Sequence, residues 1–331
     1  MKPPRVSIII PAYESSSTIA DCLRGLKAQT FRDFEVIVVN SSQERETRRI
    51  LDSEFPDAIF EQVDHRLLPH AARNVGASRA RGEVLVFSDP DCRAHPDWLE
   101  RLVAAHDSGH ALVCGAIEMN DDARWFERGV HLCKYSFRLS GLTPGKTWVA
   151  GTANACCSRE LWNAIGPFDG DHFSGDAQFS WAAASRGHVP WFEPRAVVVH
   201  RYIGSMSDLL TERFSRGADF ATARMYFDGW SRPRALGHFV AFPLALALVI
   251  GRGLRDAVVV GGFGSFLATL PMQIAGHTAW LVGEERAYLS YSGRKSSKAT
   301  IRLPDIALLA GDARSEIASS HSSSSRFDDR R

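Results

Sequence analysis

The chain has 331 residues, of which 45% are apolar and 23% charged, and its formal net charge at pH 7 is +1. These proportions are those of an ordinary globular protein, long enough for one large domain or for one domain with an appendage. A net charge so close to zero offers no broad electrostatic attraction for nucleic acid, so a nucleic-acid partner is not expected.

The cysteines and the N-terminal residues indicate the compartment. Six cysteines are present without a CxxC pair, and the opening MKPPRVSIIIP is interrupted by proline too early for a secretory signal peptide. We therefore expect a reduced protein that faces the cytosol.

Residues 1–204 alternate short apolar runs, rich in β-branched residues, with helical patterns. The runs cover 6–10, 35–39, 58–62, 83–88 and 111–116, and the helical patterns cover 17–28, 44–54, 70–81 and 96–106. Continuous apolar strands are buried on both faces, and intervening helices imply right-handed crossovers. The alternation predicts an α/β domain with a doubly wound, mainly parallel sheet, which binds ligands beyond the carboxyl ends of its strands.

The chain changes character after residue 204. Residues 205–234 combine apolar and basic side chains in an amphipathic pattern, which predicts a helical linker. Within 235–290, the runs 235–251 and 257–283 contain no Asp, Glu, Lys or Arg. As a single helix the second run would reach roughly 40 Å, against about 30 Å of bilayer hydrocarbon. We expect a helical hairpin that is either membrane-associated or packed within the protein.

The segments on either side of the uncharged runs suggest how the appendage is oriented and where it ends. Several arginines precede the uncharged runs, which favours a catalytic domain on the cytosolic side of a membrane. Residues 291–331 are polar and serine-rich, so they cannot bury enough apolar surface to fold and are expected to be disordered.

A pair of carboxylates follows the run 83–88. Asp89 and Asp91 stand one residue apart, and alternate residues at a strand end can direct hard oxygen ligands to one cation. Mg²⁺ or Mn²⁺ suits such ligands and leaves positions open for substrate phosphates. The alternative is a loop whose aspartates form a turn or cap the next helix.

Several segments occur in the order and spacing of a known family: VSIIIPAYE (6–14), QTFRDFEVIVVN (29–40), ARNVGASRARGEVLVFSDPD (72–91) and HPDWLERL (95–102). The pattern continues through GTANACCSRELWNAIGPFD (151–169), GDAQFSWAAASRG (175–187) and VVVHR (197–201). Over about residues 5–201 the chain resembles glycosyltransferase family 2. The resemblance implies the GT-A fold and an inverting hexosyltransferase that uses a nucleotide-sugar donor and a divalent metal, Mg²⁺ or Mn²⁺.

The resemblance also implies a donor site and a metal site. Its donor-binding residues are Pro11, Ala12, Tyr13, Glu14, Asn40, Arg73 and Asp89. Asp89 and Asp91 would hold the metal, and His200 resembles a histidine that joins this site in some members, although a strand-end histidine is also often structural. Family members commonly have an aspartate in place of Asn40. An amide oxygen still accepts a hydrogen bond, so a UDP-sugar is favoured while the base stays open.

The catalytic base implied by the resemblance is Asp176, with Asp169 and Asp171 as alternatives nearby in the sequence. Gly175 and Gln178 stand where further acidic residues are frequent in the family. Small residues would let an acceptor approach closely. The expected acceptor-side residues are Trp148, Gly151, Thr152 and Asn154.

The leading hypothesis is transfer of a sugar to a lipid-linked or cell-envelope glycan acceptor at the cytoplasmic face of the cell membrane, as in polysaccharide biosynthesis. One alternative is a nucleotidyltransferase that makes nucleotide sugars, but PAYESSST lacks the glycine-rich phosphate loop that such an enzyme needs. The other is a non-catalytic GT-A-like binding protein, suggested by Asn40 and Gly175 and opposed by the retained aspartates.

Overall fold

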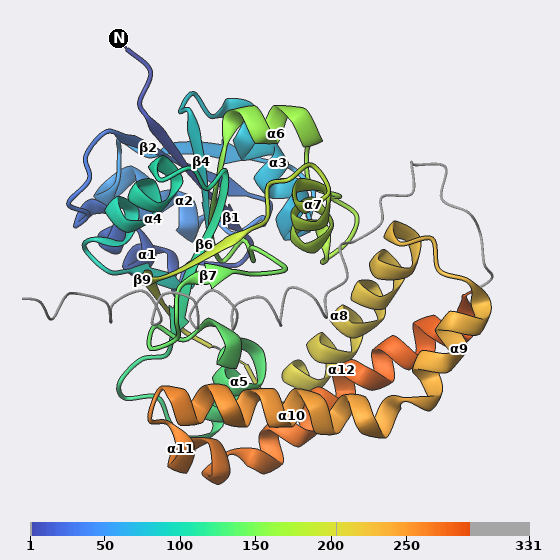
Figure 1. The fold of residues 1–331 in the computed structure, drawn as a ribbon. Coiled ribbons are helices and arrows are strands. Elements are labelled where there is room, and N and C mark those ends of the chain that lie inside the picture. The colour runs from blue at the N-terminus through green and yellow to red at the C-terminus, as the bar shows by residue number, and fades with distance from the viewer. Residues whose placement is uncertain (1, 203, 292–331) are drawn as a thin grey trace, which may run out of the picture.

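The computed structural model describes residues 2–202 and 204–291, whose strands form one nine-stranded sheet (Figure 1). The strand order is β3-β2-β1-β4-β8-β6-β9-β5, with β7 paired to β9. The strands are β1 (Val6–Ala12), β2 (Phe34–Asn40), β3 (Ile59–Gln62), β4 (Val84–Ser88), β5 (Cys92–Ala94), β6 (Leu112–Glu118), β7 (Gly145–Lys146), β8 (Asn154–Ser158) and β9 (Trp191–His200).

The sheet is mostly parallel, as the sequence predicted. β3, β2, β1 and β4 are parallel neighbours, and β9 runs parallel to β6. The antiparallel strand β8 lies between β4 and β6 and reverses the direction twice. It comes from the segment NACCS, whose small buried side chains carry no sign of its direction.

Helices cover both faces of this sheet. α1 (Ile19–Lys27), α2 (Glu46–Glu54) and α4 (Trp98–Asp107) pack on one face, and α3 (Pro69–Arg79), α6 (Arg159–Ile165) and α7 (Gly175–Ala184) on the other (Figure 1). In β1, Ile8 and Ile10 join the first core cluster while Ile9 joins the second. This alternation explains the continuous apolar runs, because each strand is buried on both sides. The strands and helices predicted within residues 1–116 are confirmed.

The remaining helices form a layer beyond the sheet edge (Figure 1). They are α5 (Trp125–Tyr135), the 3₁₀ helix η1 (Ser136–Arg138), α8 (Met206–Phe227), α9 (Arg232–Val240), α10 (Phe242–Val259), α11 (Phe263–Ala268) and α12 (Leu270–Ser290). α8 and α12 pack so closely that a Cβ on Gly283 would lie 2.0 Å from the Phe214 carbonyl oxygen. A Cβ on Gly217 would lie 2.1 Å from the Trp280 carbonyl oxygen. Glycine at both positions therefore permits direct backbone contact.

The appendage differs from the expected linker (205–234) followed by a hairpin (235–290). Since α8 packs along α12, both segments belong to one helical layer. The uncharged run 257–283 is not one long helix, because the backbone turns at Gly261, where φ is +75°, and the run is divided among α10, α11 and α12. The predicted tail lies outside the described residues from residue 292 onward.

No single helix in the described part of the chain is long and apolar enough to cross a membrane. α9 and α10 meet that criterion only as a pair, and they are bent by 67° at the break between them.

Candidate active site

A cavity of about 960 Å³ lies at the carboxyl ends of the parallel strands. Ala12 ends β1, Asp89 follows β4, and Ile117 is near the end of β6, and all three line the cavity. Asp176 lines it from α7. The opposite part of its wall comes from α8, α10 and α12, so the cavity lies between the sheet and the helical layer.

The acidic pair lies where the sequence predicted it, directly after β4. One carboxylate oxygen from each of Asp89 and Asp91 and the Cys92 sulfur all lie within 4.8 Å of one another. Antiparallel pairing of β5 with β9 sets Cys92 opposite His200. His200 Nε2 is consequently 3.4 Å from an Asp91 carboxylate oxygen.

These residues fit a hard divalent cation. Burial raises the pKa of the Asp91 carboxyl; His200 opposes the shift, and the neighbouring Asp89 charge adds to it. Burial also raises the pKa of the Cys92 thiol well above its usual range, so this soft donor stays protonated. Two carboxylates and an imidazole nitrogen remain, a donor set that suits Mg²⁺ or Mn²⁺.

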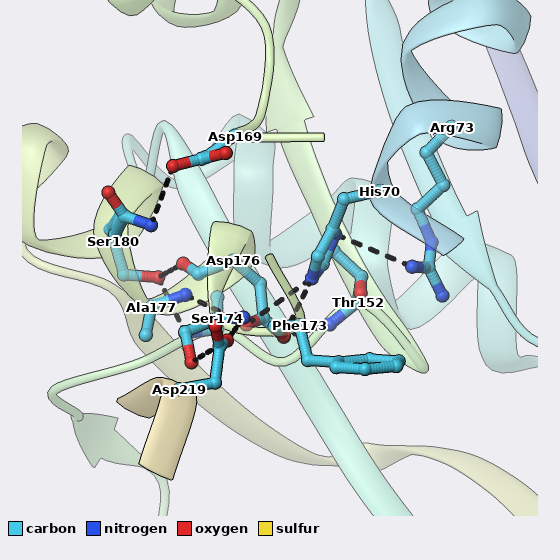
Figure 2. A network of polar contacts seen from close by, with 12 residues as sticks. His70, Arg73, Thr152, Asp169, Phe173, Ser174, Asp176, Ala177, Ser180 and Asp219 are labelled. Atoms are coloured by element: carbon cyan, nitrogen blue, oxygen red, sulfur yellow. Dashed lines mark hydrogen bonds and ion pairs between the residues drawn. The ribbon is translucent and has the colours of Figure 1, made fainter. Parts of the chain in front are cut away.

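Asp176 lies in the first turn of α7 with its carboxylate held by two backbone amides (Figure 2). It accepts hydrogen bonds from Thr152 N at 3.2 Å and from Ala177 N at 2.8 Å. Its side chain is 22% exposed and lines the cavity. The alternatives Asp169 and Asp171 are absent from the wall of the cavity, and Asp169 instead accepts a hydrogen bond from Gln178. Asp176 is thus the carboxylate of the three that an acceptor can reach.

His70, which the sequence reading did not single out, lies beside Asp176 (Figure 2). Its Nε2 is 3.1 Å from the Phe173 carbonyl oxygen and 3.7 Å from Asp176 Oδ1. Burial lowers the pKa of His70 to about 4; Asp176 opposes that shift and Arg73 adds to it. The ring is therefore neutral at pH 7. Because a carbonyl only accepts, Nε2 carries the hydrogen and Nδ1 is free to accept.

Arg73 connects His70, and through it Asp176, to the acidic pair. Its Nη1 lies 3.5 Å from His70 Nδ1, and its Nη2 contacts the Asp89 carboxylate. The four side chains Asp176, His70, Arg73 and Asp89 form a continuous polar chain across the cavity wall. The spacing of His70 and Arg73, three residues apart on α3, could have indicated that both face the same side.

A further contact fixes the segment that leads into α7. Asp219 of α8 accepts hydrogen bonds from the backbone N and the hydroxyl of Ser174, both at 2.9 Å (Figure 2). Its other carboxylate oxygen is 2.8 Å from His172 Nδ1. The helical layer thereby holds the loop that positions the candidate base.

The expected donor residues divide into two groups. Pro11, Ala12, Tyr13, Arg73 and Asp89 line the cavity. The Tyr13 ring is covered by the Arg66 guanidinium at 4.4 Å, a contact that no sequence pattern indicated.

Glu14 and Asn40 do not line the cavity, which corrects their assignment to the donor site. Glu14 is exposed outside the cavity wall, in a left-handed backbone conformation with φ of +49°. Asn40 is fully buried, and its amide donates to Ser42 O at 3.1 Å and to Gln62 Oε1 at 2.9 Å. Asn40 therefore shapes the loop that carries Ser41, and Ser41 lines the cavity in its place.

The expected acceptor-side residues lie in different surroundings. Trp148, Gly151 and Thr152 line the cavity. Asn154 is wrong as an acceptor residue, because it is buried and its amide group is fully used within the fold. It donates to Ala116 O at 2.7 Å and Ala196 O at 2.8 Å and accepts from the Trp98 indole at 2.8 Å.

Three comparisons with known proteins agree with this architecture. The family model described as Glycosyl transferase family 2 matches residues 7–166. Glycosyltransferase AglE of Haloferax volcanii is 30% identical over 223 residues, which cover 65% of this chain and 72% of the relative. The undecaprenyl-phosphate 4-deoxy-4-formamido-L-arabinose transferase of Pseudomonas fluorescens is 28% identical over 130 residues, 37% of this chain and 38% of the relative.

A solved structure supports the fold. The mannosyltransferase PcManGT from Pyrobaculum calidifontis, in complex with GDP-Man and Mn²⁺, has a TM-score of 0.58 and 21% identity over 88% of each chain. The sheet thus has the GT-A fold. The chain belongs to glycosyltransferase family 2.

Proposed function

We propose that the protein transfers a sugar, with inversion, from a nucleotide-diphosphate donor to a lipid-linked or cell-envelope glycan acceptor, and that it requires Mg²⁺ or Mn²⁺. The observation that carries the proposal is that Asp176 and the Asp89–Asp91 pair line the same cavity and are joined through His70 and Arg73. A base and a cation site in one cavity are what inverting transfer needs. A UDP-sugar is the favoured donor.

In this reaction the Asp176 carboxylate takes the proton of the acceptor hydroxyl while that oxygen bonds to the anomeric carbon. The bond from the anomeric carbon to the departing diphosphate oxygen breaks on the opposite face. General-base assistance of this kind contributes typically about 10²–10⁴ in rate. The Thr152 and Ala177 amides fix the direction of the carboxylate, and the neutral His70 ring lies 3.7 Å from it.

Asp89, Asp91 and His200 would hold the metal. When bound, such a cation neutralises the negative charge that develops on the departing diphosphate. Tyr13 and Arg66 lie where the nucleotide base would stack, because both line the cavity at the end of β1. Arg73 fixes the orientation of the Asp89 carboxylate.

We also propose that the protein acts at the cytoplasmic face of the cell membrane. Fourteen of the eighteen exposed large apolar side chains among the described residues lie between Met206 and Leu289. Val240 is 78% exposed and Leu244 61%, both near the bend between α9 and α10. An apolar outer surface of this extent on one layer suits contact with a bilayer.

The donor and metal requirements are tested by thermal unfolding of the purified protein with UDP-, GDP- and dTDP-sugars, each with and without Mn²⁺ or Mg²⁺. At about 100-fold saturation, binding adds roughly 2.7 kcal/mol to the free energy of unfolding. We expect stabilisation that needs both the metal and one nucleotide class. The Asp91→Ala variant should lose the metal-dependent part. No stabilisation by any donor would contradict the proposed transfer.

A further inference from the structure

We call the part of the cavity wall that contains Asp89 and Asp176 the catalytic edge of the sheet. From there the cavity continues into the helical layer. There its wall contains three arginines of α8, Arg213, Arg216 and Arg224, together with Phe220 of the same helix. The spacings of three, four and four residues place these side chains along one face of the helix. That face is turned toward the interior of the molecule, where isolated cations are costly.

Arg213 has the fewest partners of the three. Within residues 2–202 and 204–291, no carboxylate lies within 4.0 Å of its guanidinium. The group instead stacks over the Trp280 ring at 4.3 Å, and its Nε is 3.4 Å from Gly276 O. Burial lowers the pKa of Arg213, although the nearby Glu212 carboxylate acts in the opposite direction.

Arg216 and Arg224 share their carboxylates with other polar groups. Glu212 lies 2.9 Å from Arg216 Nε and also 2.9 Å from Lys134 Nζ. Glu284 lies 3.2 Å from Arg224 Nη2 and also accepts a hydrogen bond from a tyrosine hydroxyl. The three arginines and Lys134 thus outnumber the two carboxylates that contact them, Glu212 and Glu284. The Arg216 side chain remains 40% exposed, because the cavity reaches it.

The same cavity has an apolar section. Ala245, Leu248 and Val249 of α10 line it. Leu248 is 50% exposed, and Leu244, one helical turn before it, is 61% exposed. Apolar side chains therefore continue from the cavity wall along α10.

We propose that Arg213, Arg216 and Arg224 bind the phosphate or diphosphate of the acceptor, and that the acceptor is a sugar carried on a lipid phosphate whose hydrocarbon chain leaves past Leu248. This inference rests on the proposed transferase function and names its acceptor class. Guanidinium groups bind phosphate through paired N–H donors, which makes arginine the suitable residue. The sugar then lies beside the base, since Asp219, one helical turn from Arg216, holds the loop before Asp176.

Donor and acceptor phosphates take different positions in this arrangement. The donor diphosphate belongs with Asp89 and Asp91, where a cation would bridge the like charges. The α8 arginines need no cation, because they are themselves the counter-charge. Binding of the lipid phosphate should therefore be independent of added metal.

The test uses the full chain and isothermal titration with farnesyl diphosphate, farnesol and inorganic pyrophosphate, without metal. We expect farnesyl diphosphate to bind most tightly, and Arg213→Gln combined with Arg216→Gln to weaken it at least about tenfold. Arg232→Gln, an exposed arginine at the start of α9, is the matched control and should bind as the parent does. Arg213→Lys, which keeps the charge, should weaken binding less than Arg213→Gln if the protein is folded normally.

Three results would overturn the inference. Equal affinity for pyrophosphate and farnesyl diphosphate would assign the cluster to a free anion, and equal affinity for farnesol would exclude phosphate recognition. Loss of metal-dependent donor binding in the arginine variants, with farnesyl diphosphate binding intact, would assign the cluster to the donor. Failure of the proposed function is seen separately, as an absence of any donor-induced stabilisation while farnesyl diphosphate still binds.

Discussion

The catalytic edge of the sheet and the helical layer distribute polar groups in opposite ways. At the catalytic edge, Asp176, His70 and Arg73 each have a specified partner within the fold. In the helical layer, Arg213 lies inside without a carboxylate partner among the described residues, whereas Val240 is exposed outside. The contacts at the first region fix the direction of the Asp89 and Asp176 carboxylates, whereas those of Arg213 within the described part of the chain leave its guanidinium without a carboxylate to neutralise it.

The two regions also differ in how they are joined. Hydrogen bonds from Ser174 to Asp219 tie the loop before the base to α8. Substrate bound against α8 can therefore be positioned relative to Asp176 without a flexible connection. Substitutions confined to one region show what each contributes to transfer, binding and stability.

The largest effect is expected at Asp176, the proposed base. Asp176→Asn should lower the rate of transfer by about 10²–10⁴, because an amide cannot accept the proton of the acceptor hydroxyl. Donor binding should remain, since the change is isosteric and leaves the acidic pair untouched. Steady-state kinetics together with donor-induced thermal shifts measure both quantities. Asp171→Asn, an exposed loop change, is the control. Undiminished transfer by the Asp176→Asn protein would place the base elsewhere.

The second effect concerns the outer surface of the helical layer. Changing Val240 and Leu244 together to aspartate should weaken binding to anionic lipid vesicles by about 100-fold, since burying one such side chain contributes roughly 1.5–3 kcal/mol. Cosedimentation with vesicles is the measurement. A double control, Lys27→Gln with Lys146→Gln, lowers the net charge equally on the exposed surface of the catalytic domain. Similar losses in both proteins would mean that charge, and not the apolar surface, determines binding.

The sequence predicted the strands and helices of the sheet because buried parallel strands are continuous apolar runs, and Ile8 and Ile9 show why. It could not predict the direction of β8, since small buried side chains suit either direction. The ordered set of family segments pointed to Asp89, Asp91 and Asp176, which line one cavity, and to His200, which lies beside Asp91.

The errors have a common physical origin. Asn154 and Asn40 lie next to residues that line the cavity. Their own side chains point into the fold and form hydrogen bonds there. Side-chain direction alternates along an extended backbone, so neighbours in sequence face opposite ways. The arginines of α8 were visible only as an amphipathic pattern, because the cavity they face exists only after α8, α10 and α12 have packed.

The third prediction concerns His70 as a positioning residue. His70→Ala should lower kcat about tenfold by removing the hydrogen bonds that connect Phe173, Arg73 and the base, with the donor KM unchanged. His70→Gln can still donate to Phe173 O and should recover part of the activity. Kinetics of both variants at saturating donor give the comparison. Equal losses in the two would indicate that only the ring volume matters at this position.

The smallest expected effect is on stability at acidic pH. It compares a buried histidine of the helical layer with an exposed histidine of the catalytic domain. Burial lowers the pKa of His277 to about 3, with a further contribution from Arg213. An unfolded histidine titrates near about 6.5, so below that pH the unfolded state binds more protons than the folded state. The stability from the neutral, buried His277 is therefore present above about pH 6.5 and is lost as the pH falls toward 3.

His277→Leu should reduce the loss of unfolding free energy between pH 7 and about 5.5 by about 1 kcal/mol, measured from urea unfolding midpoints. His188→Leu, an exposed change in the catalytic domain, should leave the pH dependence as it is. A pH dependence unaltered by His277→Leu would mean that this side chain gains protons equally in both states, and that water reaches it inside the cavity.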